Sequence, residues 1–343
     1  MQLVRSFVAL GPLLTATSAA FTATEIFSFT PSNPVFIENL FVLPDNRILL
    51  THFGGPGPDS PLYVLNQTSG TVSVVASLPN STAQTGIAAL GGSKYAITTG
   101  VLGANFEFVN GSVAAHIISL APGSGTATLL DTIPIPDTIS TNGLVALPAA
   151  GSNSRHILLS ADSRGFRLLK INTATRTASV AFADPLFGGN PNITQSIGIT
   201  GVNGLNLRPG KRWDGYVYFT NSARGIYGRV QVDSAGDKVG SGAAQVVSTI
   251  ATPPGQENFF DDLAVTRFGH GYVAWQTDKL VRIDGATGAQ TMVLGPGVPG
   301  AGVALRYPTS VKLGLSGREV YVATGGIDAS GNMLGGQVVK VTF

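Results

Sequence analysis

One pattern recurs about six times along this 343-residue chain and limits what it can fold into. In each copy a polar residue opens a short apolar strand, and a turn follows. A second strand ends in small polar residues, and a third strand often carries an Arg or Lys. The six openings are Glu38, Thr85, Asn142, Asn203, Asp262 and Thr309. They are 47, 57, 61, 59 and 47 residues apart, which suits a unit of four short strands.

The segments of each copy alternate between apolar and polar residues, as half-buried β-strands do, and turn residues separate them. The copy at Asn203–Leu207, Tyr216–Thr220 and Gly228–Val232 shows this clearly, and no long amphipathic helix is evident. Six such units predict an all-β, six-bladed β-propeller with four-stranded blades, each packed against its neighbours. A β-sandwich is the alternative, but a single sandwich is usually much shorter than this chain.

The last copy offers only three strands, at Ser310–Leu315, Glu319–Ala323 and Gly336–Phe343. The alternating segment Thr24–Phe29 near the N-terminus belongs to no other copy. We expect it to join the last blade as its fourth strand and to close the ring, because closure removes an exposed sheet edge.

Composition excludes several classes of function. Charged residues make up only 12% of the chain, and the formal net charge of +2 comes without any run of Lys or Arg. This distribution argues against a nucleic-acid partner. The absence of Cys excludes disulfides, thiolate metal sites and a Cys nucleophile. No segment of the chain is long and apolar enough to predict a membrane span.

Residues 1–20 have the features of a secretory signal peptide. Arg5 supplies the positive charge, Phe7–Leu14 a short apolar core, and Ser18–Ala20 a cleavage site of small residues. Four N-glycosylation sequons follow, at Asn66, Asn80, Asn110 and Asn192. We therefore expect a secreted or lumenal protein in which residues 21–343 form a single propeller domain.

Propeller geometry predicts where polar side chains gather. The first strand of each blade lines the central channel, and the second strand returns, so its end lies near the start of the first. We call this end of the channel the mouth. It should collect the six openings together with the ends of the second strands, which include His52-Phe53, Thr98-Thr99, Asp162–Arg164, Asn221–Arg224, Trp275-Gln276 and Thr324. Concave sites with a few convergent polar groups are the usual ligand sites.

The openings resemble those of the SMP-30/gluconolactonase-like six-bladed propellers. The resemblance is carried by Glu38–Leu40 with Leu49–Thr51, by Val202–Leu205 and by Asp261–Val265. In that family a Glu, an Asn and an Asp at these positions bind one divalent cation, and a lactone is hydrolysed. The resemblance implies the ligands Glu38, Asn203 and Asp262, an all-oxygen set that suits Ca²⁺ or Mg²⁺.

Glu38 differs from the family pattern in the residues that follow it, and the aspartate that faces the channel is not determined by the motif. The family's Glu usually precedes Gly-Pro and an aromatic residue, whereas Glu38 precedes Asn39–Phe41. Adjacent strand residues also point in opposite directions, so the choice between Asp261 and Asp262 as the residue facing the channel stays open.

Over nearly the whole chain after residue 20, the sequence is also similar to a secretory fungal branch of this superfamily. The segments Asn33–Leu40, Leu43–Thr51 and Gly335–Val338 carry this similarity. The branch includes hetero-Diels–Alderases of tropolonic sesquiterpenoid biosynthesis, which join a tropolone ortho-quinone methide to a humulene-type alkene. The resemblance therefore implies small, apolar substrates, namely a tropolone and a sesquiterpene.

The first functional hypothesis is this cycloaddition, which requires no cofactor. It needs a pocket that holds two apolar partners face to face and a donor to the quinone methide oxygen. The candidate donors are His52, Asn142, Asn203, Gln276 and Thr309. The candidate substrate-binding residues are Phe53, Thr85, Phe106, Asp162, Arg224, Trp275 and Tyr307.

Two alternatives remain. A metal-dependent lactonase or esterase would bind its cation through Glu38, Asn203 and Asp262 and use a further carboxylate such as Asp162 as base. A binding propeller without catalytic activity is the third hypothesis, because a fold does not determine a function.

Overall fold

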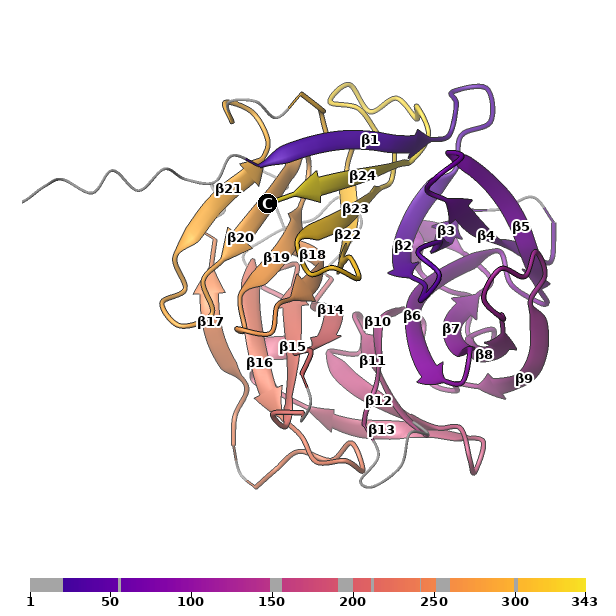
Figure 1. The fold of residues 1–343 in the computed structure, drawn as a ribbon. Coiled ribbons are helices and arrows are strands. Elements are labelled where there is room, and N and C mark those ends of the chain that lie inside the picture. The colour runs from indigo at the N-terminus through magenta and orange to yellow at the C-terminus, as the bar shows by residue number, and fades with distance from the viewer. Residues whose placement is uncertain are drawn as a thin grey trace, which may run out of the picture.

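The computed structural model contains six four-stranded antiparallel sheets arranged as the blades of a propeller (Figure 1), which confirms the predicted fold class. It describes residues 21–54, 57–148, 156–190, 200–210, 213–240, 242–250, 260–298 and 302–343. The predicted signal peptide, residues 1–20, lies outside these ranges, as does the sequon at Asn192. No helix in the described ranges is long and apolar enough to cross a membrane.

The first three blades follow one another along the chain. Blade 1 consists of β2 (Phe36–Val42), β3 (Ile48–Phe53), β4 (Ser60–Asn66) and β5 (Thr71–Leu78). Blade 2 consists of β6 (Ala83–Gly91), β7 (Lys94–Gly100), β8 (Ala114–Ser119) and β9 (Thr128–Pro134). Blade 3 consists of β10 (Thr141–Ala146), β11 (Ile157–Asp162), β12 (Arg167–Asn172) and β13 (Thr177–Ala183).

Three more blades complete the ring. Blade 4 consists of β14 (Val202–Leu207), β15 (Tyr216–Asn221), β16 (Ile226–Gln231) and β17 (Gln245–Thr249). Blade 5 consists of β18 (Phe260–Val265), β19 (Gly271–Trp275), β20 (Lys279–Ile283) and β21 (Gln290–Leu294). Blade 6 consists of β22 (Pro308–Leu313), β23 (Glu319–Thr324), β24 (Gln337–Thr342) and β1 (Thr22–Ser28). Two short 3₁₀ segments, η1 (Ala104–Phe106) and η2 (Pro185–Phe187), are the helical elements of the described ranges.

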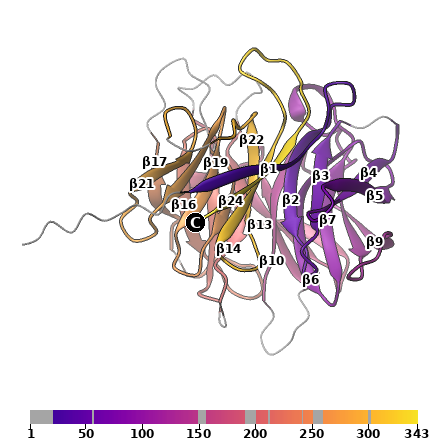
Figure 2. The same ribbon diagram turned by 45° about the horizontal axis from the view of Figure 1, so that its top comes forward.

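The N-terminal strand closes the ring as predicted. β1 pairs antiparallel with β24, with Thr22 opposite Thr342 and Ser28 opposite Gln337. Figures 1 and 2 show β1, in indigo, beside the yellow strand β24. β1, near the N-terminus, and β24, near the C-terminus, therefore belong to the same blade, and this pairing closes the ring. The backbone groups on the outer edge of β24 are paired with β1 rather than left exposed.

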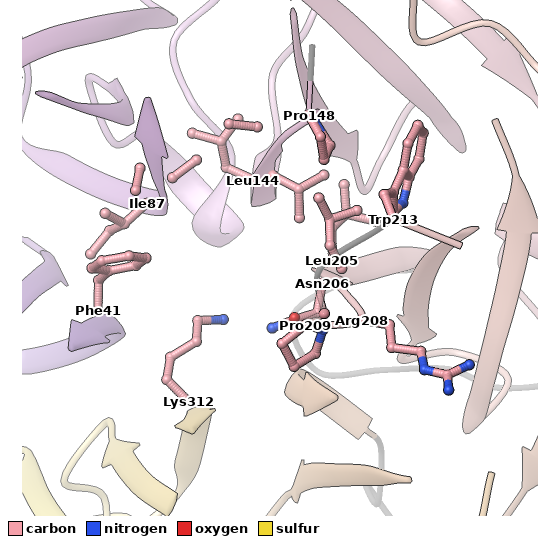
Figure 3. A pocket seen from close by; sticks show the side chains of 16 residues that line it. Phe41, Ile87, Leu144, Pro148, Leu205, Asn206, Arg208, Pro209, Trp213 and Lys312 are labelled. Carbon is pink, nitrogen blue, oxygen red and sulfur yellow. The ribbon is translucent and has the colours of Figure 1, made fainter. Parts of the chain in front are cut away.

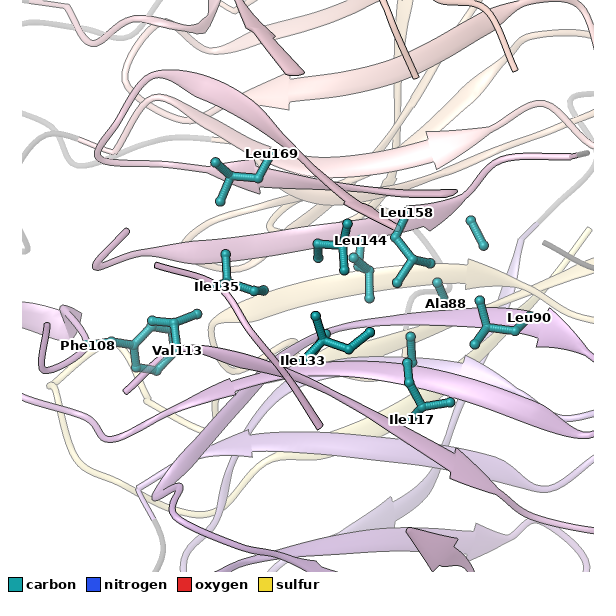
Figure 4. Packing of buried hydrophobic residues seen from close by; sticks show 14 of the residues in the cluster. Ala88, Leu90, Phe108, Val113, Ile117, Ile133, Ile135, Leu144, Leu158 and Leu169 are labelled. Carbon is teal, nitrogen blue, oxygen red and sulfur yellow. The ribbon is translucent and has the colours of Figure 1, made fainter. Parts of the chain in front are cut away.

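Apolar side chains fill the spaces between neighbouring blades (Figure 4). Between blades 2 and 3, Ile117 and Ile133 pack in one buried cluster with Leu144, Leu158 and Leu169. Burying each such side chain contributes about 1.5–3 kcal/mol relative to leaving it exposed. Since a single blade cannot cover its own two faces, this packing holds the six sheets around the channel and fixes where their inner strands begin.

Candidate functional site

A small cavity lies at the predicted mouth, where the inner strands begin. Its volume is about 60 Å³, which is room for a cation and a few waters. It is lined by Phe36, Glu38, Phe53, Phe106, Phe108, Ser140, Thr141, Asn142, Arg164, Thr200, Asn203, Asp261, Gln276 and Tyr307. The mouth thus combines two carboxylates and three amide side chains with a wall of aromatic rings.

A β-bulge at the start of every inner strand directs these polar side chains. In each blade the inner strand has one residue more than its partner strand between two consecutive pairs. In β14 the bulge holds Asn203 and Gly204, and in β18 it holds Asp261 and Asp262. Bulges bend a strand and redirect side chains next to functional sites. The six predicted openings therefore all lie where the chain departs from regular strand geometry.

Glycine in the bulge lets adjacent inner strands approach closely. A Cβ built on Gly143 would lie 2.3 Å from the backbone nitrogen of Leu205 in the next blade. A Cβ on Gly204 would lie 2.4 Å from Oδ1 of Asp262. The Asn-Gly pairs at the start of β10 and β14 thus place an amide in the mouth while allowing tight contact between blades.

Asp261 has one carboxylate oxygen satisfied and one open. Gln276 Nε2 donates to Asp261 Oδ2 over 2.6 Å, while Asp261 Oδ1 is buried without a hydrogen-bond partner. Burial, followed by the charge of Asp262, raises the pKa of the Asp261 carboxyl well above its usual value, against the effect of the nearby Asn203 amide and of the hydrogen bond from Gln276. An ionised Asp261 therefore requires a further source of positive charge.

Glu38 is buried under similar conditions, with only 4% of its surface exposed. Burial, followed by the charges of Asp261 and Asp262, raises the pKa of the Glu38 carboxyl well above its usual value. A hydrogen bond from Asn142 acts in the opposite direction. Two carboxyl groups that interact in a buried site resist joint ionisation unless a cation joins them.

The hydrogen bonds around Asn203 fix which way its amide points. The Ser222 hydroxyl donates to the Phe260 carbonyl over 2.8 Å, so it can only accept from Asn203 Nδ2, at 2.9 Å. Asn203 Oδ1 then has no partner, although it is buried. Gln276 Nε2 donates to Asp261, and the other atom of this amide, Oε1, is likewise buried without a donor. The mouth therefore contains three open carboxylate or amide oxygens, beside the unpartnered hydroxyl of Thr141. Carboxylate and amide oxygens are the ligands that a hard cation prefers.

Aromatic rings form the wall above these oxygens. The ring of Phe36 lies 5.6 Å from that of Phe53, 6.2 Å from that of Phe106 and 6.1 Å from that of Tyr307, measured between centroids. Phe53 and Phe106 are 5.7 Å apart. Phe106 is 41% exposed, and both Phe106 and Tyr307 have left-handed backbone angles, with φ of 57° and 61°. Such conformations are costly for bulky residues and occur often at ligand sites.

Seven of the residues predicted for the site line the mouth. They are Glu38, Phe53, Phe106, Asn142, Asn203, Gln276 and Tyr307. The other seven lie outside its lining, and these are His52, Thr85, Asp162, Arg224, Asp262, Trp275 and Thr309.

Most of the side chains outside the lining have partners elsewhere. The ring of His52 is 1% exposed and bonds the Pro61 carbonyl over 2.9 Å, within blade 1. Asp162 pairs with Arg167 at 2.8 Å. Thr85 bonds Thr98, Thr309 donates to the Ile37 carbonyl, Arg224 donates to the Gly189 carbonyl, and Trp275 packs against Phe260 and Lys279. These side chains stabilise strand ends and turns.

The structure corrects the choice between the two adjacent aspartates, because Asp261 rather than Asp262 faces the mouth. Asp262 Oδ2 instead accepts hydrogen bonds from Asn39 Nδ2 at 2.9 Å and Ser310 at 3.1 Å, and from the Lys312 ammonium at 2.6 Å. This network links the inner strands β18, β2 and β22. Asp262 is therefore a buried structural carboxylate with its own partners.

Sequence reasoning missed several residues of the wall. Phe36 lies two positions before Glu38, so strand alternation already places the two on one face, and this signal was available. Ser140 and Thr200 lie just before inner strands, outside the alternating pattern. That pattern therefore could not predict which way their side chains point. Arg164 belongs to a turn predicted at the mouth, and its guanidinium donates to the Asn105 carbonyl at 3.0 Å.

In the described ranges, no group of three or more His, Asp or Glu side chains is arranged to hold a metal ion. A cation in the mouth would instead be held by two carboxylates, Glu38 and Asp261, assisted by amide oxygens. The open Asn203 and Gln276 oxygens fit that requirement, since Ca²⁺ and Mg²⁺ accept carboxylate, carbonyl and water oxygens in mixed sets.

Comparison with known proteins supports the fold. No protein-family model matches this chain, and no curated protein sequence matches it. A luciferin-regenerating enzyme has a TM-score of 0.59 at 12% identity, covering 94% of this chain and 96% of its own. The PQQ-bound aldose sugar dehydrogenase of Streptomyces coelicolor has a TM-score of 0.59 at 12% identity, with coverages of 95% and 99%. The calcium-binding protein regucalcin of Agrobacterium tumefaciens has a TM-score of 0.54 at 15% identity, with coverages of 94% and 95%. At such low identities the likeness shows the propeller fold alone.

Proposed function

We propose that the mouth binds one divalent cation and that the protein hydrolyses a lactone or ester there. The open oxygens of Asn203, Asp261 and Gln276 carry this proposal, because buried acceptors without donors are costly unless a cation satisfies them. The calcium-binding neighbour regucalcin, which has the same fold, is consistent with it.

The residues of the mouth have separable tasks in this reaction. The carboxylates of Glu38 and Asp261 and the amide oxygens of Asn203 and Gln276 would hold the cation, which when bound polarises the carbonyl of the substrate. Gln276 fixes Asp261 by its short hydrogen bond. Phe36, Phe53 and Tyr307 exclude water and give an apolar surface for the part of the substrate next to its carbonyl. Asp162 takes no part, because its carboxylate pairs with Arg167 outside the mouth.

The test is hydrolysis of a panel of lactones and aryl esters by protein treated with chelator and then resupplied with Ca²⁺, Mg²⁺, Mn²⁺ or Zn²⁺. We expect chelation to abolish turnover and one of these cations to restore it. Asp261→Asn should reduce kcat/KM at least about 100-fold, as expected for loss of a charged cation ligand. Glu107→Gln is the matched control, since Glu107 is a nearby carboxylate that does not line the mouth. Full turnover in excess chelator would overturn the proposal.

The aromatic wall supports cycloaddition as a second candidate function. Four rings lie at the mouth, and the raised pKa of Glu38 favours the protonated form of its carboxyl when no cation is bound. A protonated Glu38, or the amide of Asn142, could then donate to the oxygen of an ortho-quinone methide while one C–O and one C–C bond form to the alkene. A tropolone and a humulene-type sesquiterpene exceed about 60 Å³, so Phe106 would have to move aside.

The two functions are separated by their response to chelator. A quinone methide generated in solution with a humulene-type alkene should give one stereoisomer of the adduct in excess chelator if cycloaddition is the function. Phe106→Ala should then change the stereoisomer ratio. Racemic product at the uncatalysed rate would exclude this second candidate and leave the hydrolase.

A further inference from the structure

The end of the propeller opposite the mouth, where the inner strands end, is hollowed in more than one place. In the cavity shown in Figure 3, the inward-pointing ammonium of Lys312 is paired with Asp262 over 2.6 Å. A second hollow, which we call the basic groove, has a volume of about 930 Å³. Its lining comes mainly from the turns after β18 and β22, from β20 and from the C-terminal Phe343. The proposed chemistry of the mouth does not use this groove.

The charge of the basic groove has one sign. Among the described residues, every charged side chain in its lining is an arginine, and these are Arg267, Arg282 and Arg318. None of the three forms an ion pair with a carboxylate in the described part of the chain. The neighbouring carboxylates have other partners, because Asp284 accepts from backbone nitrogens of its own turn and Glu319 accepts from a serine hydroxyl. The groove therefore carries positive charge that the protein itself does not neutralise.

The local contacts of these arginines leave donors for a ligand. The Arg267 guanidinium lies over the ring of Phe268, 4.6 Å from its centroid, so a face of the guanidinium is covered while its N–H groups lie in the plane. Arg282 lies opposite Tyr272 in the β19–β20 pair, and this neutral side chain does not compensate its charge. The fork of donors on a guanidinium matches the two oxygens of a carboxylate.

Exposed apolar side chains lie beside these cations. Phe268 is 63% exposed and Leu315 57% exposed, the two highest values among large apolar side chains of the described residues. Further inside, the rings of Tyr272 and Phe343 stack with centroids 5.2 Å apart, and both line the groove. Arginine and aromatic residues are enriched in protein–protein interfaces and contribute much of the binding energy there.

We propose that the basic groove docks an acidic peptide segment of a partner protein, with carboxylates on the three arginines and an apolar side chain between Phe268 and Leu315. The arginines come from two turns and a strand, so a chain with several carboxylates matches them better than one small anion does. A flat anionic membrane would reach the exposed turns but not Tyr272, which lines the groove while only 3% exposed. The groove lies away from the mouth, so this proposal does not depend on a cation there.

Fluorescence polarisation of a short labelled peptide tests the proposal with the full chain. In the peptide, Asp and Glu alternate with Leu and Phe. One comparison peptide has Asn and Gln in place of the acids, and another has Ser in place of Leu and Phe. We expect saturable binding of the acidic apolar peptide, at least about tenfold tighter than that of either comparison peptide and weaker at high salt. Equal affinities for the acidic peptide and its amide counterpart would overturn the proposal.

Variants of the groove locate the binding. Arg267 and Arg318 are exposed, so replacing them should leave the fold intact. The double variant Arg267→Gln/Arg318→Gln should bind the acidic peptide at least about tenfold more weakly. Arg176→Gln/Arg229→Gln is the matched control, since it removes the same charge outside the groove. An equal loss in the two double variants would show that net charge rather than the groove binds the peptide.

Phe268→Ser tests the apolar contact and should also weaken binding of the acidic peptide. Val109→Ser is its control, because Val109 is 50% exposed and lies outside the groove. Two further results would overturn the proposal. Binding to phosphatidylserine vesicles but not to the peptide would assign the groove to a membrane surface, and a wild-type dimer that Arg267→Gln/Arg318→Gln dissociates would assign it to a second copy of the chain.

Discussion

Buried polar residues in this propeller are of two kinds. Thr85 and Thr309 are fully buried and hydrogen-bonded, so they stabilise strand ends and have no capacity left for a ligand. Asn203 and Asp261 are also buried, yet each keeps one oxygen without a donor. Buried atoms without a partner also occur elsewhere in the described residues, at His52 and Tyr321 for example, but at the mouth three such oxygens line one cavity. At this scale, the site residues are those whose unpartnered oxygens face the same cavity.

His116 in β8 gives a prediction about pH. It is 1% exposed, and burial lowers its pKa from 6.5 to about 4. The unfolded chain therefore binds more protons than the folded one between those values, so stability is full above pH 6.5 and falls as the pH drops towards 4. The contribution of His116 to the free energy of unfolding should fall by about 2 kcal/mol between pH 7 and 4.5.

The measurement is urea unfolding of the wild type and of His116→Asn at both pH values. Glu38 and Asp261 have raised pKa values and act in the opposite direction, so only the difference between the two proteins isolates His116. The advantage of the wild type should shrink by about 2 kcal/mol at pH 4.5. An advantage that does not change with pH would contradict the assignment.

At the scale of the element, the bulged inner strand is the unit that builds the mouth. In β10 the bulge contains Gly143, which lies in tight contact with the next blade. We expect Gly143→Ala to destabilise the protein by at least about 2 kcal/mol, because the new methyl group would meet the backbone of Leu205. Gly125→Ala is the control, since a methyl group at that position would have nothing within 4 Å. Equal urea midpoints for the two variants would show that the close approach of β10 and β14 is unimportant.

The bulge also explains how far sequence could predict the site. Repetition of the strand pattern was enough to find all six openings, because hydrophobic alternation survives in each blade. Alternation could not decide between Asp261 and Asp262, since a bulge interrupts the two-residue period just where the choice arises. Nor could it show that His52 bonds Pro61 within its own blade, because that contact depends on a side-chain rotation at a strand end.

On the scale of the whole molecule, closure of the ring by β1 holds together six blades, none of which can bury both of its faces alone. Both the ring and the partner of β1 were predictable, because Thr24–Phe29 was the one alternating segment left without a blade. The size of each cavity could not be predicted from the sequence, because it depends on how side chains from five or six blades pack together.

Removal of residues 1–28 tests the closure. The shortened chain loses β1 and the burial of Ile26 and Phe27 against blade 1 and blade 6, which should cost at least about 3 kcal/mol. It also exposes the edge of β24, which promotes association between chains. We expect a lower thermal midpoint and oligomers in size-exclusion chromatography. A monomer as stable as the full chain would show that closure by β1 is dispensable.

The cation at the mouth is the claim on which the proposed function depends, and anomalous diffraction from crystals grown with Mn²⁺ tests it most directly. The account predicts one anomalous peak among Glu38, Asn203 and Asp261, and its loss in Asp261→Asn crystals grown the same way. A mouth without a peak in the wild type, with hydrogen-bond donors or water on the oxygens of Asn203 and Asp261, would contradict it.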